Sequence, residues 1–299
     1  MKYRVRHMTR YAYSGSVSLS HNELVLLPRS TPDQYVLDTQ VIVDPAPPRR
    51  YERNDFFGNR LINFSLDKPH DALQITAESI IELAQQPRLT AADLAGPGWE
   101  QERDAIAAGV SGLVVTDRQF VLESMHVPLL PVVAEYAGPS FIPGRSLYDA
   151  CVDLTRRIHE DFRYAPGETH IHSSLSEVLH KRVGVCQDFA HLAIACVRSQ
   201  GLLARYVSGY VETEPPPGQL KLQGVDASHA WFAVYFPGTG WVDFDPTNNL
   251  IPMYRHVTLA WGRDYGDVTP VKGVLFGGGD CHELEVAVDV LPMDSPETV

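Results

Sequence analysis

Apolar and polar residues alternate with a period of two over much of the first 85 residues. This alternation covers four segments: 2–7, 23–27, 37–43 and 73–82. A period of two is typical of a half-buried β-strand, because successive side chains of a strand point to opposite faces. Gly58-Asn59, between two apolar pairs, indicates a hairpin turn. Residues 1–85 are therefore predicted to form a β-rich N-terminal domain, an antiparallel sandwich or barrel-like sheet.

Prolines interrupt the pattern from residue 86 to residue 144 and break any long element. A short helix is expected over 99–108. We interpret 86–144 as a segment that connects two larger units of the chain.

A helical pattern begins near residue 145. Apolar residues of 147–162 recur at i, i+3, i+4 and i+7, and residues 174–177 form a Ser-x-x-Glu capping box that opens a short helix. A third helix has an apolar face over 189–197 and ends at Gly201. Strands are then expected over 205–211, 228–236, 241–245 and, near the end of the chain, 283–291. Helices followed by strands give an α+β class, with 145–299 as the second domain.

Composition and charge narrow the function classes. The chain has 25 Lys and Arg against 37 Asp and Glu, a formal net charge of −12. Nucleic acid and anionic membranes both reward positive charge, so neither is an expected partner. The N-terminus lacks the apolar core of a secretory signal, and no stretch reaches the roughly 18 apolar residues of a membrane span. The four cysteines lie far apart, so we expect a cytoplasmic protein with reduced thiols.

Cys186 lies where the third helix is expected to begin, directly after Gly184-Val185. The unpaired N–H groups and the positive dipole end at a helix N-terminus favour a thiolate, which is the nucleophilic form of cysteine. The same N–H groups could bind an oxyanion. A buried structural thiol is the alternative, since free cysteine is among the most buried residue types.

His229 and Asp245 lie on two strands joined by the turn at Pro237-Gly238-Thr239. If this loop has three residues, Phe236 opposes Gly240, and His229 becomes the diagonal neighbour of Asp245 on one face. Diagonal partners are about 7–8 Å apart, within reach of long side chains. A two-residue loop would place them on opposite faces, so the pairing depends on the register. The alternative is a half-buried histidine and a turn-capping aspartate.

Two runs, GVCQDFAHLAIACVRSQGLLARYVSGY and SHAWFAVYFPGTGWVDFDPTNN, resemble the core of the bacterial transglutaminase-like superfamily. The resemblance extends from residue 145 to about residue 255. The opening YRVRHMTRYAYSGSVSLSHNELVLLPR resembles the N-terminal domain that accompanies this core. The resemblance implies a papain-like fold in which Cys186, His229 and Asp245 are nucleophile, base and orienting acid.

The activity implied is acyl transfer from a peptide or isopeptide amide through a thioester on Cys186. Water would complete hydrolysis, as in a protease or amidase, and an amine would complete transamidation; we expect hydrolysis to predominate. Tyr164 could donate a hydrogen bond to the oxyanion, or it could be a half-buried packing aromatic. The alternative from another functional class is a non-catalytic binding or scaffold module that retains the transglutaminase-like fold. The sequence motifs do not specify the amide substrate or the oligomeric state.

No cofactor is expected, and no metal. Four histidines lie around the nucleophile in the sequence: His170, His172, His180 and His191. They lack the spacing of a zinc site, and no twelve-residue calcium loop occurs. The ligand-rich run 280–283 follows three glycines and is interpreted as a loop entering a strand. A metallohydrolase is therefore disfavoured.

Overall fold

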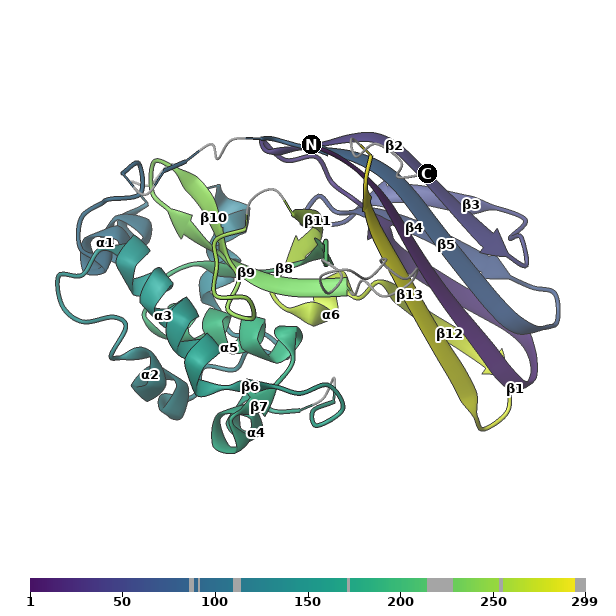
Figure 1. The fold of residues 1–299 in the computed structure, drawn as a ribbon. Coiled ribbons are helices and arrows are strands. Elements are labelled where there is room, and N and C mark those ends of the chain that lie inside the picture. The colour runs from purple at the N-terminus through teal and green to yellow at the C-terminus, as the bar shows by residue number, and fades with distance from the viewer. Residues whose placement is uncertain are drawn as a thin grey trace, which may run out of the picture.

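The computed structural model describes residues 1–85, 89–90, 92–109, 114–170, 173–213, 228–252 and 255–293. It has two parts, a large antiparallel sheet on one side and a mixed helical and sheet region on the other (Figure 1). Together they give the mixture of helices and antiparallel strands that the sequence predicts. Within these ranges, no helix combines the length and apolar character needed to cross a membrane.

The large sheet is built around one long strand, β1 (Lys2–Leu27). Its main path runs in the order β2-β5-β1-β4-β3. The other strands of that path are β2 (Gln34–Asp44), β3 (Arg50–Asn54), β4 (Arg60–Leu66) and β5 (His70–Leu83). The expected hairpin turn lies between β3 and β4. Apolar residues from β1, β2, β4 and β5 form a core of their own within this sheet.

Two C-terminal strands correct the predicted domain boundary. β12 (Val271–Gly277) and β13 (His282–Pro292) both pair antiparallel with β1 (Figure 1). The strand expected over 283–291 is therefore present, but it belongs to the N-terminal sheet and not to the second domain. Alternation identifies a strand without identifying its partner, because the polar face of a strand carries little information on which backbone pairs with it.

The second part carries most of the helices. Those before its sheet are α1 (Trp99–Ala108), the 3₁₀ helix η1 (Val115–Val121), α2 (Pro131–Ala137), α3 (Leu147–Asp161), α4 (Leu175–Lys181) and α5 (Cys186–Ser199). The capping box at Ser174 is present, with its hydroxyl accepting from the backbone N–H of Glu177. Gly201 adopts a positive φ of 76° directly after the cap of α5, as a C′ glycine does.

A four-stranded sheet follows, in the order β10-β9-β8-β11. Its strands are β8 (Ala204–Val211), β9 (Ser228–Phe236), β10 (Gly240–Phe244) and β11 (His256–Gly262), and the short helix α6 (Tyr265–Val268) follows them. α5 packs against β8 and β9, and nearly all of its length is buried. The strand β11 was missed in the sequence. It pairs antiparallel with β8.

The two parts share one apolar core. Tyr3 and Val5 of β1 and Val288 and Val290 of β13 belong to the same buried cluster as α3, α5 and the four-stranded sheet. Polar contacts reinforce this contact surface, since the Gln34 amide exchanges two hydrogen bonds with the backbone of Thr258. The N-terminal sheet therefore forms part of the surroundings of the four-stranded sheet.

Candidate active site

Cys186 is the first residue of α5 and is half-buried. The turn before it is held by Asp188, whose Oδ2 accepts hydrogen bonds from the backbone N–H of Val185 at 2.9 Å and the hydroxyl of Thr169 at 2.8 Å. A side chain at Gly184 would lie 2.9 Å from Cβ of Asp188, so the approach to Cys186 requires glycine. Asp188 thus organises the start of the helix, which is the role expected for a first-turn acid.

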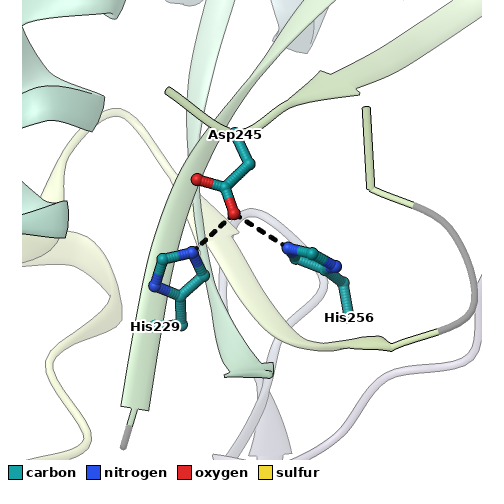
Figure 2. A group of neighbouring side chains, drawn as sticks. All are labelled: His229, Asp245 and His256. Carbon is teal, nitrogen blue, oxygen red and sulfur yellow. Dashed lines mark hydrogen bonds and ion pairs between the residues drawn. The ribbon is translucent and has the colours of Figure 1, made fainter. Parts of the chain in front are cut away.

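The hairpin that carries the histidine and the aspartate has the register predicted for a three-residue loop. Phe236 pairs with Gly240 and Phe232 with Phe244, so His229 and Asp245 lie diagonally across the hairpin. Nε2 of His229 lies 2.7 Å from Oδ2 of Asp245 (Figure 2). The sequence argument about loop length therefore led to the observed contact.

Five hydrogen bonds surround the carboxylate of Asp245, which is fully buried. Oδ1 accepts from the backbone N–H groups of Thr247 at 2.9 Å and Asn248 at 3.2 Å. Oδ2 accepts from His229, from the Asn248 side-chain amide at 2.7 Å and from Nε2 of His256 at 2.9 Å. Burial alone would raise the pKa of Asp245, but the bonds from His229 and His256 lower it well below its usual range.

His229 is held between two groups. Its Nε2 is engaged by Asp245 at 2.7 Å, and Cys186 is the second side chain that acts on the pKa of the ring. Burial lowers the pKa of His229, but the hydrogen bonds to Asp245 and Cys186 and the negative charge of both outweigh it and raise the pKa to about 10. The surroundings of the imidazole therefore favour its protonated form.

Two tyrosines have pKa values that respond to the charge of Cys186. Tyr164 lies on the short strand β6 (Arg163–Tyr164) and is 51% exposed, and burial followed by the charge of Cys186 raises its pKa. Tyr206, on β8, is almost fully buried, and burial followed by the charge of Cys186 raises its pKa well above the usual value. Tyr206 was missed in the sequence because it reads as an ordinary apolar strand residue.

His256 and Asn248 were missed as well. Asn248 belongs to the DPTNN motif that carries the resemblance, so the motif contained a signal that was not used. His256 opens a strand that was not predicted, and no spacing rule links it to Asp245. Only the fold places it there.

Three of the four histidines weighed as metal ligands are among the described residues, and these three do not join this group. His170 and His180 are exposed, and His191 is buried and accepts a hydrogen bond from the backbone N–H of Tyr265. His172 lies outside the described residues. Among the residues that the structure describes, one group has the side-chain types and proximity of a metal site: His229, Asp245 and His256. Its nitrogen–oxygen separations of 2.7 and 2.9 Å are hydrogen-bond distances.

A cavity of about 810 Å³ lies beside this group, between the N-terminal sheet and the face of the four-stranded sheet that carries His256. Arg205 in the wall of this cavity stacks on the indoles of Trp241 and Trp261. Its Cζ lies 4.3 Å from the ring centroid of Trp241 and 3.7 Å from that of Trp261. Burial lowers the pKa of Arg205 to about 9. Asp243 lines the same cavity and accepts a hydrogen bond from Nε1 of Trp231.

Comparison with known proteins identifies the family. Residues 142–246 match the model of the transglutaminase-like superfamily, and residues 3–82 match that of the bacterial transglutaminase-like N-terminal region. An uncharacterized protein of Mycobacterium tuberculosis (strain ATCC 25618 / H37Rv) is 39% identical over 98% of this chain and 93% of its own length. The chain belongs to the bacterial transglutaminase-like proteins.

Two further relatives bear on this transglutaminase-like protein. A solved structure from Cytophaga hutchinsonii, provisionally described as a cysteine protease, covers 99% of this chain and 92% of its own with a TM-score of 0.72 at 22% identity. That likeness shows a shared fold. A protein-glutamine gamma-glutamyltransferase of Pseudomonas aeruginosa is 33% identical over 103 residues, 33% of this chain and 15% of the relative. The family match and the structural likeness support a papain-like fold.

Proposed function

We propose that this transglutaminase-like protein cleaves amide bonds of peptides or proteins, with Cys186 as nucleophile, His229 as acid and base, and Asp245 as the orienting acid. The observation that carries the proposal is the 2.7 Å contact of His229 with the buried carboxylate of Asp245, on an imidazole whose pKa also responds to Cys186 at the start of α5. A binding module without catalysis would have no use for an imidazolium beside a half-buried thiol. Cofactors have no part in this chemistry.

The first half-reaction transfers the acyl group to the enzyme. The sulfur of Cys186 attacks the amide carbonyl carbon, and the C–S bond forms as the carbonyl oxygen takes the negative charge. The C–N bond then breaks, and the leaving nitrogen takes the proton that His229 carries. A thioester and a free amine result.

The second half-reaction resolves the thioester. Water attacks the carbonyl carbon, His229 accepts its proton, and the C–S bond breaks to release a carboxylic acid and the Cys186 thiolate. If a primary amine attacks instead, the product is a new amide. Asp245 stays ionised throughout and stabilises the imidazolium of His229 in both halves.

The oxyanion of each tetrahedral intermediate needs donors. Backbone N–H groups at the start of α5 are the first source, because they have no partner within the helix. We propose Tyr164 as the second, since its hydroxyl is accessible and its pKa responds to the charge of Cys186.

Hydrolysis is the predicted outcome. Transamidation requires an amine to compete with water at about 55 M, which takes a site that excludes water. The loop Glu212 to Asp226, expected from the sequence to form a wall of the cleft, lies mostly outside the described residues. The Pseudomonas aeruginosa relative favours the alternative, because its name denotes transfer of the γ-glutamyl group of a protein glutamine. The cytoplasmic location stays a prediction.

A product assay decides between the two outcomes. A mixture of glutamine-containing peptides is offered with a labelled primary amine at millimolar concentration, and mass spectrometry compares free acid with labelled amide. The proposal expects mostly free acid, and no product from Cys186→Ala. Mostly labelled amide would make this an amine-transferring enzyme, and equal turnover by Cys186→Ala would remove the nucleophile assignment.

A further inference from the structure

One oxygen of Asp245 accepts hydrogen bonds from two imidazoles. Nε2 of His229 lies 2.7 Å from Oδ2, and Nε2 of His256 lies 2.9 Å from the same atom (Figure 2). An ionised carboxylate only accepts, so both histidines must carry a proton on Nε2. The nucleophile, base and acid of the proposed function use one of these imidazoles and leave the role of the other open.

The scaffold holds His256 in place independently of Asp245. It is the first residue of β11, paired with Val211 of β8, and only 8% of it is exposed. Its ring stands perpendicular to the indole of Trp231, with centroids 5.2 Å apart. Trp231 is itself fixed by the hydrogen bond from its Nε1 to Asp243. A donor held this firmly constrains the acceptor it meets.

The second donor also affects the electrostatics of the first. The N–H of His256 brings positive charge to the oxygen that binds His229, and the two rings lie 5.8 Å apart. Positive charge there weakens the attraction of Asp245 for the imidazolium, because the two donors compete for the same lone pairs. Without His256, the carboxylate would bind the proton of His229 more tightly.

Resting on the proposed function, we propose that His256 is a positioning residue that fixes the carboxylate of Asp245 and moderates its hold on His229, so that His229 can release its proton to the leaving amine. An acid that holds its proton too tightly protonates a leaving group slowly. His256 thereby sets the proton affinity of the catalytic acid without touching the substrate.

The other charged groups near His229 and His256 remain unchanged when His256 is substituted. Cys186 and Asp245 face His229, and Asp243, which acts on His256 through its charge, comes from β10. Arg205 of β8 lies across the same cavity wall as His256. None of these is altered by a substitution at His256, so a change in His229 reports the lost donor.

Two polar substitutions separate the hydrogen bond from the packing. In His256→Gln the side-chain amide nitrogen is as far along the chain as Nε2, so a donor to Asp245 is kept. In His256→Asn the amide reaches only the position of Nδ1, and the donor is lost. If His256→Asn does not fold, His256→Phe offers a ring of similar size without the donor.

The first readout needs no substrate, so it separates this proposal from the proposed function. ¹⁵N NMR of the imidazole side chains follows the deprotonation of His229 with pH. We expect its midpoint to rise by about half a pH unit or more in His256→Asn and to stay near wild type in His256→Gln, as loss of a donor to a charged group predicts. An unchanged midpoint in His256→Asn, or equal shifts in both variants, would overturn the proposal.

The second readout is kinetic. With an amide substrate, His256→Asn should lower kcat about tenfold and change KM little, because the effect lies in proton transfer and not in substrate binding. His256→Gln should recover most of the loss. A rise in KM with unchanged kcat would assign His256 to substrate binding and contradict the positioning role.

Discussion

His229 and Asp245 meet across a hairpin whose loop has three residues, with Nε2 and Oδ2 2.7 Å apart. The carboxylate is fully buried and the imidazole side chain is 10% exposed. Opposite charges in this setting stabilise one another, and Cys186 acts on the pKa of the same imidazole. The reactivity of the cysteine is therefore coupled to a carboxylate that the solvent does not reach.

Asp245→Asn should give a folded protein with greatly reduced turnover. The amide offers one acceptor oxygen where five donor contacts converge, and it removes the charge that keeps His229 protonated. The comparable change in a serine triad costs about 10⁴ in kcat; a loss of about 10² to 10⁴ is expected here. Steady-state kinetics with the amide substrate measure it.

Asp243→Asn is the matched control for that change. It removes a half-buried carboxylate two residues away, yet an amide oxygen can still accept from Trp231. A much smaller loss of turnover is expected. Equal losses in the two variants would mean that the Asp245 effect comes from general disturbance of β10.

Cys186 should react with iodoacetamide at pH about 6 well before the other three cysteines, since an ordinary thiol with a pKa near 8.5 is almost entirely protonated there. Cys151 and Cys196 are fully buried, and burial raises the pKa of both. Cys281 is exposed and serves as the internal control for simple accessibility. Peptide mass spectrometry over time gives the four rates; equal rates at Cys186 and Cys281 would remove the thiolate–imidazolium pair.

Gly209→Ala should destabilise the protein by about 3 kcal/mol or more. A Cβ at this position of β8 would lie 2.1 Å from the carbonyl oxygen of Val257 and 2.4 Å from the ring of Trp231. The control is Gly138→Ala, where the nearest atom is 3.4 Å away and φ is −45°. That change should be neutral or slightly stabilising in urea unfolding, and similar values for both variants would contradict the packing described around Trp231.

Stability should fall as the pH drops below about 6.5, with His7 contributing. Its ring is buried between Tyr210 and Thr9, and burial lowers its pKa to about 4. Between pH 6.5 and pH 4, the unfolded chain binds a proton at His7 that the folded protein does not bind. The free energy of unfolding therefore decreases as the pH is lowered through this range. His7→Gln should reduce that slope by up to about 1.4 kcal/mol per pH unit in urea titrations; an unchanged slope would mean that His7 titrates normally.

Local patterns predicted the parts of the fold that local physics decides. α1 and β9 have the expected boundaries, and the capping box at Ser174 formed as its spacing predicts. The three-residue loop before Gly240 placed His229 on the face of Asp245, because strand side chains alternate strictly. These elements depend on neighbours in the sequence.

Long-range pairing was not predictable in the same way. β13 alternates like any half-buried strand, yet it pairs with β1, more than 250 residues earlier in the chain. His256 lies at the start of a strand that the sequence did not reveal, and it joins Asp245 through pairing with β8. The fold thus supplies a second histidine to Asp245 that no motif or spacing indicates.

The central claim is that an acyl group passes through Cys186. The most direct test mixes the protein with a peptide amide, quenches in acid within seconds and measures the mass of the intact chain and of its peptides. The account predicts an adduct of acyl mass on the peptide that contains Cys186, removed by hydroxylamine and absent from Cys186→Ala. An adduct on another residue, or turnover with an adduct that Cys186→Ala retains, would contradict it.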